Sequence, residues 1–204
     1  MDFINKSTVE IARNLLGKKL LMKHDGMMIG GYIVETEAYI GTEDMACHSY
    51  NGKRTPKVEA MYLEGGRIYV YVMHTHHMVN IVTKSENEPE AVLIRAIEPI
   101  DGIEMMAVNR GKDDIEISNG PGKLTKAMGI TKELNGSLIN EGKLTLDEVN
   151  CRWPRNICVT SRIGIPDKGE WTDALLRFYV KGNPYVSGMK KKDMKNVRDT
   201  WDQK

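Results

Sequence analysis

Glu35 and Glu37 are the residues whose types and spacing first suggest chemistry. They lie in the run at 31–41, whose β-branched and aromatic residues predict a strand. Because side chains alternate along a strand, both carboxylates and Tyr39 should share one face. The loop that follows carries His48. A carboxylate, a tyrosine and a histidine could form an acid–base site that holds a flat ring, although an ordinary solvated strand face would show the same alternation.

Two carboxylates allow two reactions. One could act as a general base that activates water, or the pair could hydrolyse a sugar bond with one of them as the acid. Side by side on one strand, however, they would not lie across a bond, so only one is expected to react. The other could pair with Arg95, which interrupts the apolar strand predicted at 90–97 and needs a buried partner.

His74, His76 and His77 lie between two predicted strands and form a second candidate site. Clustered histidines can bind a transition metal, but no His-Glu-x-x-His motif accompanies them. At an exposed hairpin tip they could instead stack on bases or touch phosphates. The sequence leaves both interpretations open.

Two glycine-rich basic segments could bind phosphate. Lys53, Arg54 and Thr55 lie in a Gly/Pro loop that could grip a phosphate backbone, or be a solvated basic loop. Lys123 lies in the run at 120–126, where glycines precede a predicted helix whose first amides would favour an anion. The spacing of a nucleotide P-loop is not met, so a plain capped helix explains that run better than a phosphate site does.

These segments must be positioned by a sheet with accompanying helices. Ser7 and Glu10 have the spacing of a capping box and predict a helix over 8–16, and Asp25-Gly26 between two apolar runs predicts a hairpin. Further helices are predicted at 101–109 and 120–129, and strands at 18–24, 27–39, 67–73, 78–83, 90–97, 143–149, 157–165 and 176–181. This order predicts a single α+β domain over 1–204, with a mainly antiparallel sheet, helices packed to one side, and a basic tail from about 190 that is frayed or helical.

Composition bounds the class of protein. The chain has 204 residues, 41% of them hydrophobic, and a formal net charge of +1, so a polyanionic partner would require locally concentrated basic residues. The three cysteines form no Cys-x-x-Cys pair, which indicates free thiols in a reducing compartment. The N-terminus has no signal-peptide pattern, and no apolar run approaches the roughly 20 residues of a membrane span. A cytoplasmic location is expected. If the protein is bacterial, we expect it to associate with the nucleoid.

Several runs resemble the alkyladenine (3-methyladenine) DNA glycosylase family. The runs cover nearly the whole chain, in order: Val-Glu-Thr-Glu-Ala-Tyr at 34–39, the segment 44–49, Arg-Thr-Pro at 54–56, Ile-Tyr-Val-Tyr at 68–71, Asn-Ile at 80–81, Leu-Ile-Arg-Ala-Ile-Glu-Pro at 93–99, Gly-Pro-Gly-Lys-Leu at 120–124, and the segment 176–184. The resemblance implies a curved sheet with a protruding hairpin that inserts into DNA. It also implies a monofunctional enzyme that flips alkylated or deaminated purines out of duplex DNA and releases them.

Each matching position then carries an implied role. Glu37 would be the general base, with Arg95 holding the water and the sugar phosphate. The remaining positions would hold the flipped base (Tyr39, His48 and Tyr71), read its edge (main-chain groups of Ala46 and His48), restrict bulky purines (Asn80) or contact DNA (Lys53 and Thr55). The resemblance implies no cofactor and no metal, and we expect a monomer whose partner is double-stranded DNA containing damaged purines.

One position departs from the family pattern. The family usually has a further tyrosine at the hairpin tip, which fills the gap left by the flipped nucleotide, whereas this chain has Met73 and His74 there. Either side chain could fill an unstacked step. Two other functions remain open from the residues alone: a non-catalytic protein that binds damaged DNA, and a metal-dependent hydrolase that uses the three histidines.

Overall fold

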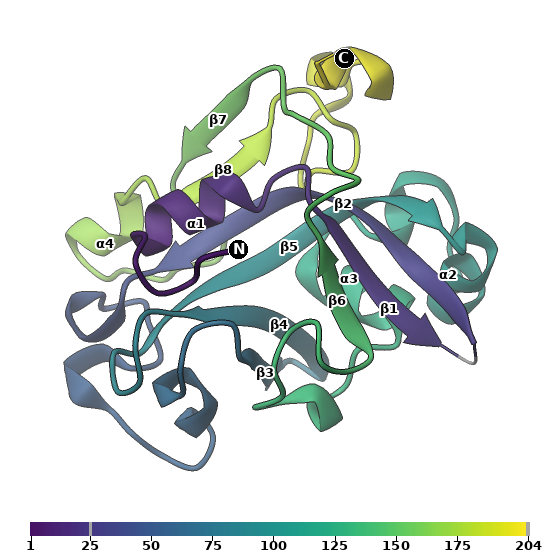
Figure 1. Ribbon diagram of the computed structural model, residues 1–204. Coiled ribbons are helices and arrows are strands. Elements are labelled where there is room, and N and C mark those ends of the chain that lie inside the picture. Colours follow the sequence, from purple (N-terminus) through teal and green to yellow (C-terminus); the bar gives the residue numbers. More distant parts are fainter. Residues whose placement is uncertain (25, 203–204) are drawn as a thin grey trace.

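A long antiparallel sheet organises the computed structural model, which describes residues 1–24 and 26–202 (Figure 1). The strands follow the order β3-β4-β5-β2-β1-β6, with β8 beside β2 and β7 beside β8. Their bounds are β1 Lys19–His24, β2 Met27–Tyr39, β3 Ile68–Met73, β4 His76–Thr83, β5 Glu90–Asp101, β6 Leu144–Asp147, β7 Ile157–Thr160 and β8 Arg177–Val180. The helices of the described residues are α1 Thr8–Asn14, α2 Ile103–Arg110, α3 Pro121–Met128 and the short α4 Glu170–Asp173. The prediction of a single α+β domain with a mainly antiparallel sheet is confirmed.

Strand β2 is the centre of the sheet because it pairs with three strands. It runs beside β5 along most of its length, while its other edge pairs first with β1 and then with β8. Irregular pairing with β5 at Gly30–Gly31 and around Glu35 curls the sheet. Gly31 permits this close crossing, since a Cβ there would lie 1.9 Å from the carbonyl oxygen of Glu98.

Helices cover both faces of β2, whereas the sequence predicted helices on one side. On one face, the Thr36 hydroxyl donates a 2.8 Å hydrogen bond to the carbonyl of Ala12 in α1. Helices α2 and α3 pack behind the sheet (Figure 1). Residues 33–38 of β2 are therefore all buried. The interpretation of this strand as an ordinary solvated face is wrong.

The predicted capping box begins α1. The Ser7 hydroxyl accepts a 3.2 Å hydrogen bond from the Glu10 amide, and the Glu10 carboxylate accepts one of 3.0 Å from the Ser7 amide. The helix ends at Asn14, and Gly17 then turns the chain with φ +82°. Strands β1 and β2 form the predicted hairpin, with His24 opposite Met27, although Asp25 of its turn lies outside the described residues.

The hairpin of β3 and β4 is tighter than predicted. Met73 pairs with His76, so the turn is only His74 and Thr75, and the strand predicted to begin at 78 begins at His76. Both turn residues have positive φ, 47° and 71°. Such turns usually carry Asn-Gly. Because this segment lacks that signal, the loop predicted from the sequence was too long.

Two other predicted elements end differently. The strand predicted at 157–165 stops at Thr160, and the following residues form a loop. The tail, predicted to be frayed or helical, forms short 3-10 helices at Lys191–Asp193 and Val197–Thr200. It is also anchored near its end, because Trp201 is 4% exposed and its indole donates a 2.8 Å hydrogen bond to buried Glu98. Among the described residues, no helix is long and apolar enough to cross a membrane, and the three cysteines are free thiols.

Candidate active site

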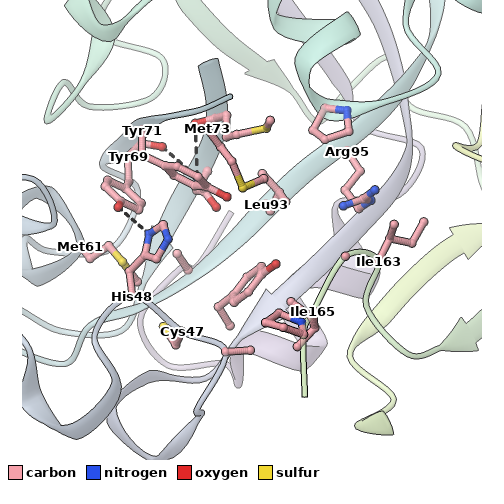
Figure 2. Close-up of a pocket in the computed structure, with 18 residues that line it drawn as sticks. Cys47, His48, Met61, Tyr69, Tyr71, Met73, Leu93, Arg95, Ile163 and Ile165 are labelled. Atoms are coloured by element: carbon pink, nitrogen blue, oxygen red, sulfur yellow. Dashed lines mark hydrogen bonds between the residues drawn. The ribbon is translucent and has the colours of Figure 1, made fainter. Parts of the chain in front are cut away.

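A cavity of about 200 Å³ opens beside the C-terminal end of β2 (Figure 2). Its lining comes from β2, β3, β4, β5, the loop after β2, the start of α3 and the loop after β7. The lining residues are Tyr39, Ala46, Cys47, His48, Met61, Tyr69, Tyr71, Met73, Met78, Asn80, Ala91, Leu93, Arg95, Pro121, Ile163, Gly164, Ile165 and Pro166. Seven of the predicted site residues therefore line one cavity: Tyr39, Ala46, His48, Tyr71, Met73, Asn80 and Arg95.

Aromatic rings form one wall of this cavity. Figure 2 shows His48, Tyr69 and Tyr71 on one side, with Arg95 and Ile163 on the other. The rings of His48 and Tyr71 are 4.5 Å apart and nearly perpendicular, at 79°. The Nδ1 atom of His48 lies 2.9 Å from the Tyr69 hydroxyl, which fixes the imidazole. Burial, with a smaller contribution from Lys53, lowers the pKa of His48, so its imidazole is neutral at pH 7.

Glu37 lies directly behind the opposite wall. Its carboxylate is fully buried and accepts hydrogen bonds from the Ile163 amide at 2.7 Å and the Tyr39 hydroxyl at 3.0 Å. The Nη1 atom of Arg95 lies 3.2 Å away, and all three partners line the cavity. Burial raises the pKa of Glu37, while Arg95 and the Ile163 amide oppose that rise. A carboxylate with a raised pKa beside a cavity is suited to accept a proton.

Glu35 has a different environment from Glu37. Its Oε1 atom accepts hydrogen bonds from Arg95 Nε at 2.9 Å, Arg177 Nε at 2.7 Å and the Ser187 hydroxyl at 2.7 Å. Its Oε2 atom accepts one of 2.8 Å from the Ser187 amide. Glu35 is therefore saturated by donors, of which only Arg95 lines the cavity, and its predicted pairing with Arg95 is confirmed.

Ala46 and Asn80 present fewer free groups to the cavity than expected. The Ala46 amide already donates a 3.0 Å hydrogen bond to Asp44. The Asn80 side-chain amide donates to the main-chain carbonyl of Tyr69 at 3.1 Å. The Asn80 side chain is thus fixed by the β3–β4 hairpin on which it lies.

Comparisons with known proteins give the family. The family model for methylpurine-DNA glycosylase (MPG) matches residues 2–184. The chain belongs to the methylpurine-DNA glycosylase family. Three relatives, each named "Putative 3-methyladenine DNA glycosylase", come from staphylococci. The protein of Staphylococcus saprophyticus subsp. saprophyticus is 58% identical over 98% of this chain and 99% of its own length. That of Staphylococcus epidermidis is 54% identical over 98% of each chain, and that of Staphylococcus aureus strain bovine RF122 / ET3-1 is 53% identical over 98% of this chain and 100% of its own length.

Of the predicted DNA-contacting residues, Lys53 and Thr55 line a groove of about 620 Å³ that shares a wall with the cavity. Lys57, Lys132 and Lys168 also line this groove. Four lysines of the described residues therefore line one groove beside the cavity.

Arg54 and Lys123 lie outside that groove. The Arg54 guanidinium is paired with Glu59 at 2.5 Å and lies 4.6 Å from the ring centre of Tyr62. Lys123 donates a 2.8 Å hydrogen bond to Asn119. The structure therefore does not bring these two cations to the cavity with the other predicted residues.

The hairpin carries Met73 to the junction of cavity and groove, where it lines both and is 45% exposed. His74 is exposed in the turn. His76 packs closely on α3, because a Cβ added at Gly122 would lie 2.8 Å from the Cβ of His76. The Thr125 hydroxyl donates a 2.7 Å hydrogen bond to the His77 carbonyl. Over residues 1–24 and 26–202, no three His, Cys, Asp or Glu side chains form a group that could hold a metal, so the three histidines do not converge.

Three contributors to the site were missed from the sequence. Tyr69 fixes His48, Ile163 donates its amide to Glu37, and Arg162 pairs with Asp44 behind Tyr39. A signal existed for Arg162, because an arginine inside a predicted apolar strand needs a buried partner, as for Arg95. The amide of Ile163 has no signal, since main-chain contacts do not depend on residue type.

Proposed function

We propose that the chain flips alkylated or deaminated purines out of duplex DNA and hydrolyses their N-glycosidic bond with a water activated by Glu37. The proposed substrates are 3-methyladenine, 7-methylguanine, hypoxanthine and ethenoadenine, and the product strand keeps an abasic site. The observation that carries this proposal is a buried carboxylate of raised pKa directly behind an aromatic cavity. Family membership supports the class of reaction.

Recognition rests on the aromatic lining. Tyr39, His48 and Tyr71 would stack against the flipped base, and a positively charged alkylated ring gains cation–π attraction of about 1 kcal/mol or more when desolvated. Because His48 is neutral at pH 7, it does not repel such a cation. Extrusion of a base costs a few kcal/mol, which stacking in the cavity offsets.

The proposed reaction moves one proton from water to Glu37 and replaces the C–N bond to the base with a C–O bond to water. Glu37 takes a proton from water as the water oxygen bonds to the anomeric carbon, and the C–N bond breaks with its electron pair leaving on the base. A base alkylated at N3 or N7 leaves as a neutral molecule, whereas hypoxanthine and ethenoadenine must also gain a proton. Arg95, 3.2 Å from Glu37, would orient the carboxylate, the water and the sugar phosphate. General-base catalysis of this kind contributes about 10²–10⁴-fold.

The reaction ends without strand cleavage. A glycosylase that cuts the strand uses an amine nucleophile, and the proposed step uses water instead. No lysine lines the cavity formed by the described residues, because the lysines lie in the adjoining groove. The proposal is therefore a monofunctional N-glycosylase that acts without a cofactor.

DNA would be held by the groove and the hairpin. Lys53 and the other groove lysines would meet phosphates, and binding should weaken strongly as salt rises. Met73 is the favoured wedge, because it lies at the junction of groove and cavity, and His74 at the turn is the second candidate.

Replacement of Glu37 by Gln tests the proposal. Duplexes carrying one hypoxanthine or one ethenoadenine are incubated with each protein, and the released base is measured by chromatography. The wild type should release free base and leave an alkali-labile site, whereas E37Q should bind the duplex and release base at least about a hundredfold more slowly. Release by E37Q near the wild-type rate would remove Glu37 as the base.

Two controls separate the rival functions. A wild type that binds the modified duplex but releases no base at any pH would be a non-catalytic binding protein. Loss of release after thorough chelation, with recovery on adding zinc, would indicate a metal-dependent hydrolase. A panel of duplexes, each with one modified purine, would then rank the substrates.

A further inference from the structure

Arg162 is a buried cation that the proposed reaction does not use. Its side chain is fully enclosed in the loop after β7. The Nη1 atom lies 2.5 Å from Asp44 Oδ2 and the Nη2 atom 2.8 Å from Asp44 Oδ1. Removing two charges from water is costly even when they are paired, and this pair lies directly behind Tyr39 of the cavity lining rather than in a distant part of the core.

The pair with Asp44 fixes the loop that follows β2. Asp44 also accepts hydrogen bonds from the amides of Ala46 at 3.0 Å and Ile40 at 3.2 Å. Ala46 and His48 of this loop line the cavity. The position of the Arg162 guanidinium is therefore coupled to the edge of the cavity where the purine would be read.

The same guanidinium also supports Tyr39. Its central carbon lies 4.7 Å from the centre of the Tyr39 ring. Its Nη1 atom donates a 3.1 Å hydrogen bond to the carbonyl of Ala38, the residue before that tyrosine. Arg162 is thus packed against a ring that would stack on the flipped base.

The third connection reaches Glu37. Ile163 follows Arg162 directly in the chain, and its amide donates the 2.7 Å hydrogen bond to the Glu37 carboxylate. A shift of the Arg162 side chain would move this amide, because the two residues share a peptide bond. Ile163 is itself 43% exposed, so its own side chain provides little anchorage.

We infer that Arg162 is a positioning residue for base excision, which holds Tyr39, the loop with Ala46 and His48, and the Ile163 amide in one fixed arrangement around the flipped base. The inference rests on the proposed function. Arg162 would not contact the base or the water, and its effect would pass through the groups that do.

Replacement by Lys separates the positioning role from simple charge pairing. Lysine keeps the positive charge, but it cannot span both Asp44 oxygens, and it has no flat face to lie against Tyr39. The Ile163 amide should then move from Glu37. The groups that face Glu37 are Arg95 from β5, Glu35 and Tyr39 from β2, Tyr71 from β3, and Arg162 itself. With Arg95 and Glu35 unchanged, loss of the amide raises the pKa of Glu37 further.

Arg152 offers a matched control. It lies 2.5 Å from buried Glu98 and its guanidinium carbon lies 4.4 Å from the ring centre of Tyr32. Arg152 therefore makes the same two kinds of contact as Arg162, an ion pair and a stacked tyrosine, outside the cavity lining. R152K should cost stability without changing excision per folded molecule.

The measurement is the single-turnover rate of hypoxanthine release against pH for the wild type, R162K and R152K, with the melting temperature of each. We expect R162K to lose about tenfold to a hundredfold in rate at neutral pH and to move the acid limb of the profile to higher pH, while R152K keeps the wild-type profile. A folded R162K protein with the wild-type rate and acid limb would overturn the inference and leave a stabilising ion pair only.

A second variant covers the case in which R162K does not fold. D44N keeps an acceptor oxygen for the Ala46 amide but loses the charge that holds Arg162, so it should shift the acid limb in the same direction. A folded D44N protein with the wild-type profile would overturn the inference equally. If the wild type releases no base, the proposed function fails. If the wild type is active and the variants match it, only this inference fails.

Discussion

Glu35 and Glu37 share the guanidinium of Arg95, whose Nε lies 2.9 Å from Glu35 and whose Nη1 lies 3.2 Å from Glu37. The two carboxylates differ in their other partners. Glu35 is further bound by Arg177 and by two groups of Ser187, whereas Glu37 keeps contact with groups that line the cavity. One arginine thus joins a structural carboxylate to the proposed general base.

Replacement of Glu35 by Gln should destabilise the fold. Arg177 would then lose its only carboxylate partner among the described residues and Arg95 would keep Glu37 alone, and breaking a buried pair costs about 3–5 kcal/mol. Urea denaturation of E35Q and the wild type measures this loss. An E35Q protein as stable as the wild type would show that Glu35 contributes little to the fold.

Replacement of Glu37 by Gln should have a pH-dependent effect on stability. Because the pKa of Glu37 is raised in the folded protein, the folded chain binds that proton more tightly than the unfolded chain. The stability of the wild type should therefore fall as pH rises through the raised pKa. E37Q lacks this term, so its free energy of unfolding relative to the wild type should be larger at pH 8 than at pH 4, which lies below the ordinary pKa of a glutamate. A difference that stays constant between these two pH values would contradict a raised pKa.

Replacement of Tyr69 by Phe should release the imidazole of His48. The variant loses the 2.9 Å hydrogen bond to Nδ1, and a bond of this type contributes about 1 kcal/mol. We expect the affinity for a hypoxanthine duplex to fall about fivefold. The measurement is a binding titration that compares E37Q with the double variant Y69F/E37Q, so that no base is released during the titration. Y32F serves as the control, because Tyr32 packs against Trp201 away from the cavity. Equal losses in Y69F and Y32F would assign the effect to general destabilisation.

Met73 should be more important than its neighbour for holding the flipped nucleotide. Met73 lines both cavity and groove, whereas Val72, 53% exposed, lines only the groove. M73A should slow excision about tenfold, in keeping with loss of one or more kcal/mol of contact at an unstacked step, and V72A should have a smaller effect. The fluorescence of ethenoadenine in duplex DNA reports unstacking directly. If H74A shows the larger loss and M73A none, His74 is the wedge.

Replacement of Trp201 by Ala should destabilise the whole domain. This indole is buried, donates to Glu98 at 2.8 Å and packs against Tyr32, and removal of a buried tryptophan costs about 3–5 kcal/mol. Trp153, 51% exposed, provides the matched control. Thermal denaturation of W201A and W153A should give a clearly lower melting temperature for W201A alone. Equal melting temperatures would mean that the tail contributes little to stability.

Local patterns in the sequence predicted much of the fold. The capping box of Ser7 and Glu10, the strand with Glu37 and the need of Arg95 for a buried carboxylate all depend on residue type and spacing, and all are present. The β3–β4 turn was predicted too long because His74 and Thr75 adopt positive φ without glycine or asparagine. The docking of Trp201 was missed because it depends on Glu98, which is distant in the chain.

The candidate site was predictable only in part. Tyr39, His48, Tyr71 and Glu37 were singled out by spacing or by resemblance, whereas Tyr69 was not. The Ile163 amide and the pairing of Arg162 with Asp44 depend on how a loop from late in the chain folds over β2. Such long-range contacts leave no periodic pattern in a single sequence.

Strand β2 is bonded to three other strands and covered on both faces, so its amides should exchange with solvent only when the whole domain unfolds. Glu37 therefore lies on a strand that is paired on both edges, while Ala46, His48 and Ile163 lie on loops. Loops tolerate sequence change better than a central strand does. In this architecture, substitutions in the loops can change part of the cavity lining while the proposed general base stays on the central strand.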